Sequence, residues 1–121
     1  MNSHNQSIDA LRSERDRTVD LIESLSARLA AVLEATSDEA SDDEHDPEGS
    51  TLAVERGQLV AQLQRSRDRL SEIDSAVERV EGGSYGRCET CGVRIDPERL
   101  DVLPAARQCI DCARKSSTRR W

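Results

Sequence analysis

Apolar residues along the first two thirds of the chain recur at alternating spacings of three and four positions. The first series contains Ile8, Leu11, Arg15, Thr18, Ile22, Leu25, Leu29 and Val32, and the second contains Leu52, Arg56, Leu59, Leu63, Ser66, Leu70, Ile73, Val77 and Val80. Both series are heptad seams of the kind found in coiled coils, interrupted by a few polar residues. They predict two helices, over about residues 6–35 and about residues 51–81.

The two seams also match each other in register. If the chain folds back on itself, the residues that meet are Ile8 with Val80, Leu11 with Val77, Thr18 with Leu70, Leu25 with Leu63, and Leu29 with Leu59. Each pair of residue numbers adds to 88, so a single turn near Glu44 closes both registers. This predicts an antiparallel hairpin with arms about 45 Å long at about 1.5 Å per residue. The alternative is that the helices pair between two chains, which a long polar connection permits.

The composition favours such a thin helical fold over a thick globular core. The chain has 121 residues, no Phe, one Tyr and one Trp, and 34% of its residues are charged. Its first residues contain no apolar stretch typical of a secretory signal, and no apolar run approaches membrane-spanning length. We therefore expect a cytoplasmic protein without a membrane segment.

The connection between the two predicted helices is strongly acidic. Thr36–Ser50 contains seven Asp or Glu residues, among them Asp42, Asp43, Glu44 and Asp46. A charge run of this kind is commonly a solvated linker. At the tip of a hairpin, however, it would attract a divalent metal or a basic protein surface. Asp46-Pro47 resembles a helix N-cap followed by proline in the first turn, with Ser50 as the competing cap.

All four cysteines lie near the end of the chain, as two Cys-x-x-Cys pairs separated by seventeen residues. In a reducing compartment such pairs indicate metal binding more than disulfides. A disulfide or a thiol redox motif would not account for both pairs together. Four thiolates form a closed tetrahedral zinc site, which leaves no position for a catalytic water. The sequence therefore predicts one structural zinc ion bound by Cys88, Cys91, Cys109 and Cys112.

The residues around the cysteines predict a small folded module. Gly92 follows Cys91 where a tight turn needs a positive φ. Asp96-Pro97 can cap a short helical turn that extends to Leu100. A last short helix is expected at the second cysteine pair. The residues that we expect to form a small separate core are Val93, Ile95, Leu103 and Ile110.

The predicted fold is mostly α: a long antiparallel helical hairpin followed by a four-cysteine zinc-finger module with a short C-terminal helix. Residues 1–81 form the hairpin, with its acidic tip at 36–50, and residues 82–121 form the zinc module and a basic tail. No phosphate-binding glycine loop or nucleophile elbow is present, and His4 and His45 fall in expected loops. We therefore expect a protein that is not an enzyme.

The stretch from Ile73 to Cys112 resembles the DksA/TraR family of bacterial transcription factors. Besides the cysteines, the residues that match the family pattern are Tyr85, Gly86, Gly92, Ile95, Arg99, Leu100, Pro104 and Ala105. The resemblance implies a protein that binds RNA polymerase and not DNA. It further implies that the hairpin enters the secondary channel of the polymerase. Carboxylates at the tip would then approach the catalytic magnesium, and ppGpp acts together with well-known members.

This chain departs from the family pattern in two places. The tip motif Asp-x-x-Asp-x-Ala is absent as such, because Gly49 and Thr51 stand where the second Asp and the Ala would be. With Asp46 aligned to the first Asp of the motif, the candidate substitutes for the second are Asp42, Asp43 and Glu44, and the four residues together form the predicted tip. The N-terminal helical extension of longer members, which contributes to the ppGpp site, is also lacking, so the resemblance leaves a ppGpp response doubtful.

Two further interpretations remain open. A zinc ribbon that binds nucleic acid would use the basic residues Arg107, Arg114, Lys115, Arg119 and Arg120. Against it, residues 1–86 carry a net charge of −10 and residues 87–121 only +3, and aromatic residues for base stacking are nearly absent. The other interpretation is a coiled-coil adaptor or dimerisation protein with a zinc-stabilised end. We expect a monomeric polymerase-binding regulator.

Overall fold

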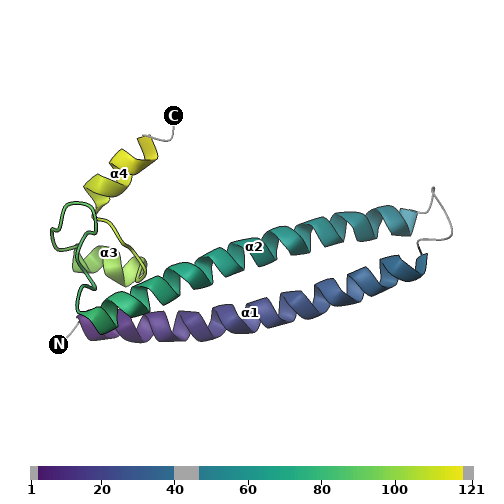
Figure 1. The fold of residues 1–121 in the computed structure, drawn as a ribbon, viewed down its shortest axis with the longest axis horizontal. Coiled ribbons are helices and arrows are strands. Elements are labelled where there is room, and N and C mark those ends of the chain that lie inside the picture. Colours follow the sequence, from purple (N-terminus) through teal and green to yellow (C-terminus); the bar gives the residue numbers. More distant parts are fainter. Residues whose placement is uncertain (1–2, 40–46, 119–121) are drawn as a thin grey trace. The chain divides into compact units, whose positions relative to one another are not determined.

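The computed structural model describes residues 3–39 and 47–118 of the chain, and within them the fold is mostly helical. Its helices are α1 (Ser3–Glu39), α2 (Pro47–Gly82), α3 (Pro97–Val102) and α4 (Ile110–Thr118). The long helices α1 and α2 form an antiparallel pair, and the four-cysteine region follows α2 (Figure 1). The only β-type pairing in the described residues is an isolated antiparallel bridge between Arg87 and Arg94. The predicted fold class is confirmed.

Both long helices extend beyond the ends expected from the heptad seams. Helix α1 has 37 residues and includes His4, which the sequence placed in a loop, and α2 has 36 residues. The seams mark only where side chains pack between helices, and helical backbone continues into flanking polar residues that favour a helix. Helix α2 begins at Pro47, whose fixed φ and missing N–H suit a first helical turn. Of the two starts considered for this helix, at Asp46-Pro47 or at Ser50, the structure has the earlier one.

Residues 17–70 form one compact unit of the structure. Its core consists of Leu25, Val32, Leu59 and Leu63, with Ile22, Leu29 and Leu52 packed against them. These side chains come from both helices, as the matching registers predict. Two polar seam residues, Thr18 and Ser66, are also buried, each with 8% of its surface exposed. Arg56, by contrast, is exposed at its seam position and takes no part in this core.

Residues 1–16 and 71–121 form the other compact unit, which contains the four-cysteine region. Its buried core brings together one end of each long helix and the segments after α2. The core residues are Leu11, Ile73, Ala76, Tyr85, Cys88, Ile95, Leu100, Ala105 and Cys112. The cysteine region therefore packs on the ends of both long helices within this unit. The division of the chain into a hairpin domain, residues 1–81, and a zinc module, residues 82–121, stays a prediction.

The separate core predicted for the cysteine region is wrong in three of its four members. Ile95 is buried, but Val93, Leu103 and Ile110 are 52%, 44% and 47% exposed. The region is too small to enclose a core of its own. Its inward-facing apolar side chains instead pack against the adjoining ends of α1 and α2, and these three face outward.

The seam of residues 17–70 can be tested with one substitution in α2. Leu63→Ala is expected to lower the free energy of unfolding by about 2–5 kcal/mol, because Leu63 is 3% exposed and its removal leaves a cavity. The matched control is Val60→Ala on the same helix, where Val60 is 51% exposed. The control should change stability by less than about 0.5 kcal/mol. Urea unfolding followed by circular dichroism measures both, and equal losses would contradict the assignment of the buried face.

Candidate metal centre

The four cysteines converge on one point in the structure. One sulfur atom from each of Cys88, Cys91, Cys109 and Cys112 lies within 4.8 Å of the other three. Cys88 and Cys112 are buried, Cys109 is half-buried and Cys91 is exposed. The two pairs of the sequence motif are thus brought together, with one side of the cluster in the core and one side open.

The first pair is held by a tight turn with paired backbone groups. The backbone N–H of Cys88 donates to the carbonyl of Val93 at 2.8 Å, and that of Gly92 donates to the carbonyl of Cys88 at 2.9 Å. Gly92 has a φ of 80°, as expected from the sequence. A Cβ atom there would meet no atom within 4 Å, so the demand for glycine comes from the backbone conformation alone.

The second pair is tied to the first by polar contacts between the two turns. The backbone N–H of Glu89 donates to the carbonyl of Arg107 at 2.9 Å, and the Arg107 guanidinium forms an ion pair with the Glu89 carboxylate at 3.1 Å. The Gln108 side-chain amide donates to the Thr90 hydroxyl at 2.9 Å. These contacts hold the two turns together independently of the sulfur atoms.

Helix α3 also supports the second turn. The Asp96 carboxylate caps the helix by accepting a hydrogen bond from the backbone N–H of Glu98 at 3.0 Å, and Pro97 occupies the first turn. The predicted cap is confirmed, and the helix runs two residues past Leu100. From α3, the Arg99 guanidinium donates to the carbonyl of Gln108 at 3.0 Å.

The end of α2 is anchored to the cysteine region by one arginine that the sequence analysis did not single out. The carbonyl of Arg79 accepts hydrogen bonds from the backbone N–H groups of Ser84 and Tyr85 at 2.9 and 3.1 Å. Its guanidinium donates to the carbonyls of Ala105 and Ala106. Burial lowers the pKa of Arg79, which indicates a partly desolvated cation. The sequence gives little indication of this role: Arg79 is distinguished only as the one basic residue in the last turn of α2.

The sulfur geometry fits a tetrahedral metal and not a disulfide. Four sulfurs at about 2.3 Å from one tetrahedral centre lie about 3.8 Å apart. The Cys91 and Cys109 sulfurs are separated by 3.8 Å. A disulfide bond would need about 2.05 Å. The chemistry of the donor set and its spacing therefore agree with a bound divalent metal.

The thiols also differ in how readily each gives up its proton. Burial raises the pKa of Cys88, but hydrogen bonds from the backbone at Cys109, Cys91 and Thr90 outweigh it and lower the pKa to about 6. Hydrogen bonding to Cys109, together with burial, raises the pKa of Cys112 to about 12. The backbone hydrogen bonds thus stabilise the thiolate form of Cys88, whereas the neighbouring cysteines favour the protonated thiol of Cys112. Four thiolates this close need a shared cation to offset their repulsion.

The other residues predicted to act lie outside this centre. Asp42, Asp43, Glu44 and Asp46 fall outside the described residues. Of the basic residues considered for nucleic-acid binding, Arg107 is engaged with Glu89, while Arg119 and Arg120 are also outside the described part of the chain. None of the described helices is long and apolar enough to cross a membrane.

Comparison with known proteins agrees with this geometry. Residues 83–117 match the prokaryotic dksA/traR C4-type zinc finger. The RNA polymerase-binding transcription factor DksA of Escherichia coli is 42% identical over 52 residues, which cover 40% of this chain and 34% of that protein. An uncharacterized protein of Aquifex aeolicus is 50% identical over 44 residues, covering 36% of this chain and 30% of its own length. The match thus spans about a third of these relatives.

The likeness in structure extends over much more of the chain. The transcription factor DksA2 of Pseudomonas aeruginosa superposes with a TM-score of 0.59 at 25% identity, covering 95% of this chain and 86% of that one. The cysteine region, residues 83–117, therefore matches the C4-type zinc finger of the DksA/TraR family. The helical hairpin joined to the finger has the fold seen in DksA2. The relatives named as DksA are RNA polymerase-binding transcription factors.

Tyr85 offers a test of how closely the segment after α2 packs on the finger. Its hydroxyl donates to the carbonyl of Pro104 at 2.8 Å, and the side chain is 7% exposed. Burial raises the pKa of Tyr85 above its ordinary value of 10.0, because the phenolate would lose solvation. The stabilisation from the neutral phenol is therefore complete below the unfolded pKa and is lost as the pH rises through the folded pKa.

Absorbance of the phenolate measures this directly, since the chain has a single tyrosine. The midpoint in the native protein is expected above the midpoint in guanidinium, and the Tyr85→Phe variant should show no such transition. A native midpoint equal to or below the unfolded one would contradict the packing described for Tyr85.

Proposed function

We propose that this chain is a zinc-containing regulator of bacterial transcription that acts by binding RNA polymerase. The observation that carries the proposal is the combination of two features in one fold. A DksA/TraR-type finger follows a long antiparallel helix pair, and the fold matches DksA2 over 95% of the chain. The relatives that share the finger at 42% identity are named for binding RNA polymerase. The cytoplasm, where polymerase works, is the proposed location.

The proposed metal is one structural zinc ion, held by Cys88, Cys91, Cys109 and Cys112. Zinc prefers four thiolate ligands in a tetrahedron, and a set of four closes the coordination sphere. When bound, the metal would supply folding free energy and neutralise the thiolates. The protein supplies the two turns, the Glu89–Arg107 ion pair between them and the buried side of the cluster.

An exposed apolar surface on the finger is the proposed contact with the polymerase. Val93, Val102, Leu103 and Ile110 are all exposed, and Val102 is 78% exposed. They line a hollow of about 650 Å³ whose rim carries charged residues of both signs. Clustered apolar side chains on a small protein commonly mark an interaction site. An apolar centre with a polar rim is also the usual anatomy of a protein interface.

The finer part of the proposal concerns the secondary channel. The family resemblance implies that the hairpin enters this channel and that the acidic segment acts near the catalytic magnesium. Residues Asp42, Asp43, Glu44 and Asp46 would carry that action, with the protein acting as a monomer. A joint effect with ppGpp is left out of the proposal, because nothing in the described residues supports it.

A binding experiment with purified polymerase from the native host tests the proposal. The zinc-loaded protein is expected to co-sediment with core polymerase, and Val102→Asp combined with Leu103→Asp should weaken binding while zinc content stays the same. The matched control is Glu72→Lys with Asp68→Lys, a change of charge at exposed positions of α2. Absence of binding by the native protein, or binding only to naked DNA in a salt-dependent manner, would overturn the proposal.

A further inference from the structure

The exposed apolar pair Val102 and Leu103 lies at the end of α3. Val102 is the last residue of the helix and is 78% exposed, and Leu103 is the C-cap and is 44% exposed. Both line the hollow that is the proposed contact with the polymerase. Packing fixes side chains as exposed as these only weakly, so their direction depends on how the residues on either side of them are held.

Two hydroxyl groups hold the residues on either side of this pair. Before the pair, the Ser7 hydroxyl from the beginning of α1 donates to the Asp101 carboxylate at 3.4 Å. After the pair, the Tyr85 hydroxyl donates to the carbonyl of Pro104 at 2.8 Å. The second distance is usual for a hydrogen bond between oxygens and the first is longer, so Tyr85 is the stronger of the two anchors.

Both hydroxyl-bearing side chains are buried, and they are linked to each other. Ser7 is 2% exposed and Tyr85 is 7% exposed. Burial raises the pKa of Tyr85, and a hydrogen bond with the Ser7 side chain opposes this rise. Side chains this buried do not reach a docked protein. Any effect of these hydroxyls on docking therefore has to pass through residues 101–104.

We propose that Ser7 and Tyr85 are positioning residues, which hold residues 101–104 so that the exposed pair faces outward before the polymerase arrives. This inference rests on the proposed function. Ordering a segment during association costs affinity, and a segment that is already held in the free protein avoids much of that cost. The beginning of α1, which lies outside the family match to residues 83–117, thereby gains a role in docking.

Amide hydrogen exchange, followed by nuclear magnetic resonance on the full-length, zinc-loaded protein, tests the positioning without polymerase. The backbone N–H of Leu103 donates to the carbonyl of Arg99 at 2.7 Å. Its exchange should become about fivefold faster in Tyr85→Phe, the factor that corresponds to one net hydrogen bond, and about twofold faster in Ser7→Ala. The amide of Gly92 in the first cysteine turn would report a general loosening of the finger, and it should keep its native rate.

Polymerase binding is then measured with the same variants at unchanged zinc content. The affinity should fall about fivefold in Tyr85→Phe and about twofold in Ser7→Ala, because the segment must now be ordered on docking. Asp101 separates hydrogen bonding from charge. Asp101→Asn keeps an acceptor oxygen for Ser7 and should bind like the native protein, whereas Asp101→Ala should behave like Ser7→Ala.

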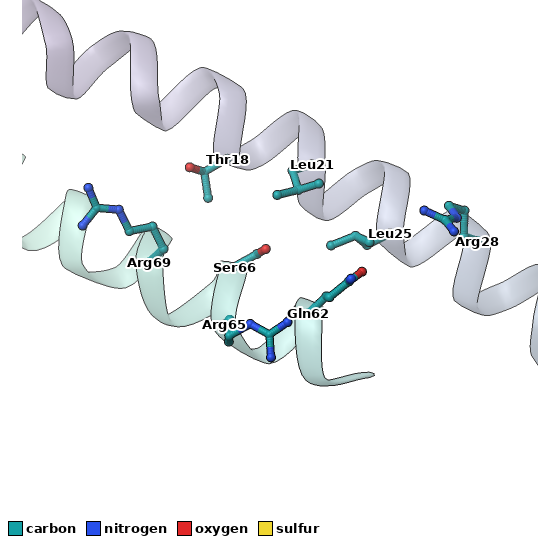
Figure 2. Close-up of a pocket in the computed structure, with 8 residues that line it drawn as sticks. All are labelled: Thr18, Leu21, Leu25, Arg28, Gln62, Arg65, Ser66 and Arg69. Atoms are coloured by element: carbon teal, nitrogen blue, oxygen red, sulfur yellow. The ribbon is translucent and has the colours of Figure 1, made fainter. Parts of the chain in front are cut away.

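The matched control is Ser66→Ala, which removes another buried serine hydroxyl from a long helix. Ser66 is 8% exposed and belongs to the other compact unit of the structure. It lines a cleft of about 440 Å³ between α1 and α2, together with Thr18 (Figure 2). Because the Ser66 hydroxyl takes no part in holding residues 101–104, its removal should leave both the exchange of Leu103 and the polymerase affinity at their native values.

Faster exchange at Leu103 together with weaker polymerase binding supports the proposal. It is overturned by unchanged exchange in Tyr85→Phe, by an equal acceleration at Gly92, or by native affinity despite faster exchange. A native protein that does not bind polymerase is a different result. That result overturns the proposed function, while the exchange rates still decide whether the two hydroxyls hold residues 101–104.

Discussion

Removal of zinc is expected to unfold the finger and loosen the helix ends packed on it, while the helices between residues 17 and 70 stay folded. The physical reason is the composition of the core around the cysteines. That core includes Cys88 and Cys112 themselves, so two of the four proposed ligands are also packing residues. Structural zinc sites of this kind contribute about 10–16 kcal/mol of apparent binding free energy, far more than so small a core can supply.

Three measurements check this expectation. Metal analysis of purified protein should give one zinc per chain, and Cys109→Ser should reduce it to near zero. Chelation should abolish the near-ultraviolet signal of Tyr85, which packs in this core, and leave most of the helical circular dichroism. The matched control is Val102→Ala, at a residue of the same unit that is 78% exposed, which should retain the metal. Reduced, folded protein without metal would contradict the prediction.

The long helices could be predicted from the sequence because the information is local and periodic. A side chain repeating every three or four positions returns to the same face of a helix, and two such faces must cover each other. The matching heptad registers therefore place Leu25 and Leu63 in one core, and both residues are buried there. The clustering of the four cysteines could be predicted equally well, since two short turns can present four sulfurs to one point.

The packing of the finger could not be predicted in the same way. Whether Val93 or Ile95 faces inward depends on hydrogen bonds and on the φ of Gly92, and no periodicity records these. The contribution of Ile73 and Ala76 to the core of the finger is a long-range contact that neither segment reveals alone. Arg79 gives little signal for a related reason: its partners are backbone carbonyls about 26 residues later in the chain.

Neutralising the acidic segment is expected to separate binding from activity. The variant Asp42→Asn, Asp43→Asn and Asp46→Asn keeps side-chain size and removes three of the seven negative charges in Thr36–Ser50. Carboxylates beside a divalent ion act on its coordination and on local charge, and their effect is strongest where solvent is excluded. The variant should bind polymerase like the native protein. Its effect on transcription in vitro should fall about tenfold or more, the scale of one lost charge-assisted contact.

A control with the same change in net charge makes this result interpretable. Asp9→Asn, Asp16→Asn and Asp20→Asn neutralise three exposed carboxylates on α1 and should leave transcription unchanged. Because the family motif Asp-x-x-Asp-x-Ala is absent, a competing mechanism is that the protein only occupies the channel and blocks other factors. Full activity of the variant with a neutral acidic segment would eliminate the carboxylate mechanism and favour this occlusion. If both triple variants lost the same share of their effect on transcription, the effect would come from overall charge, because the two variants differ only in where the charge is removed.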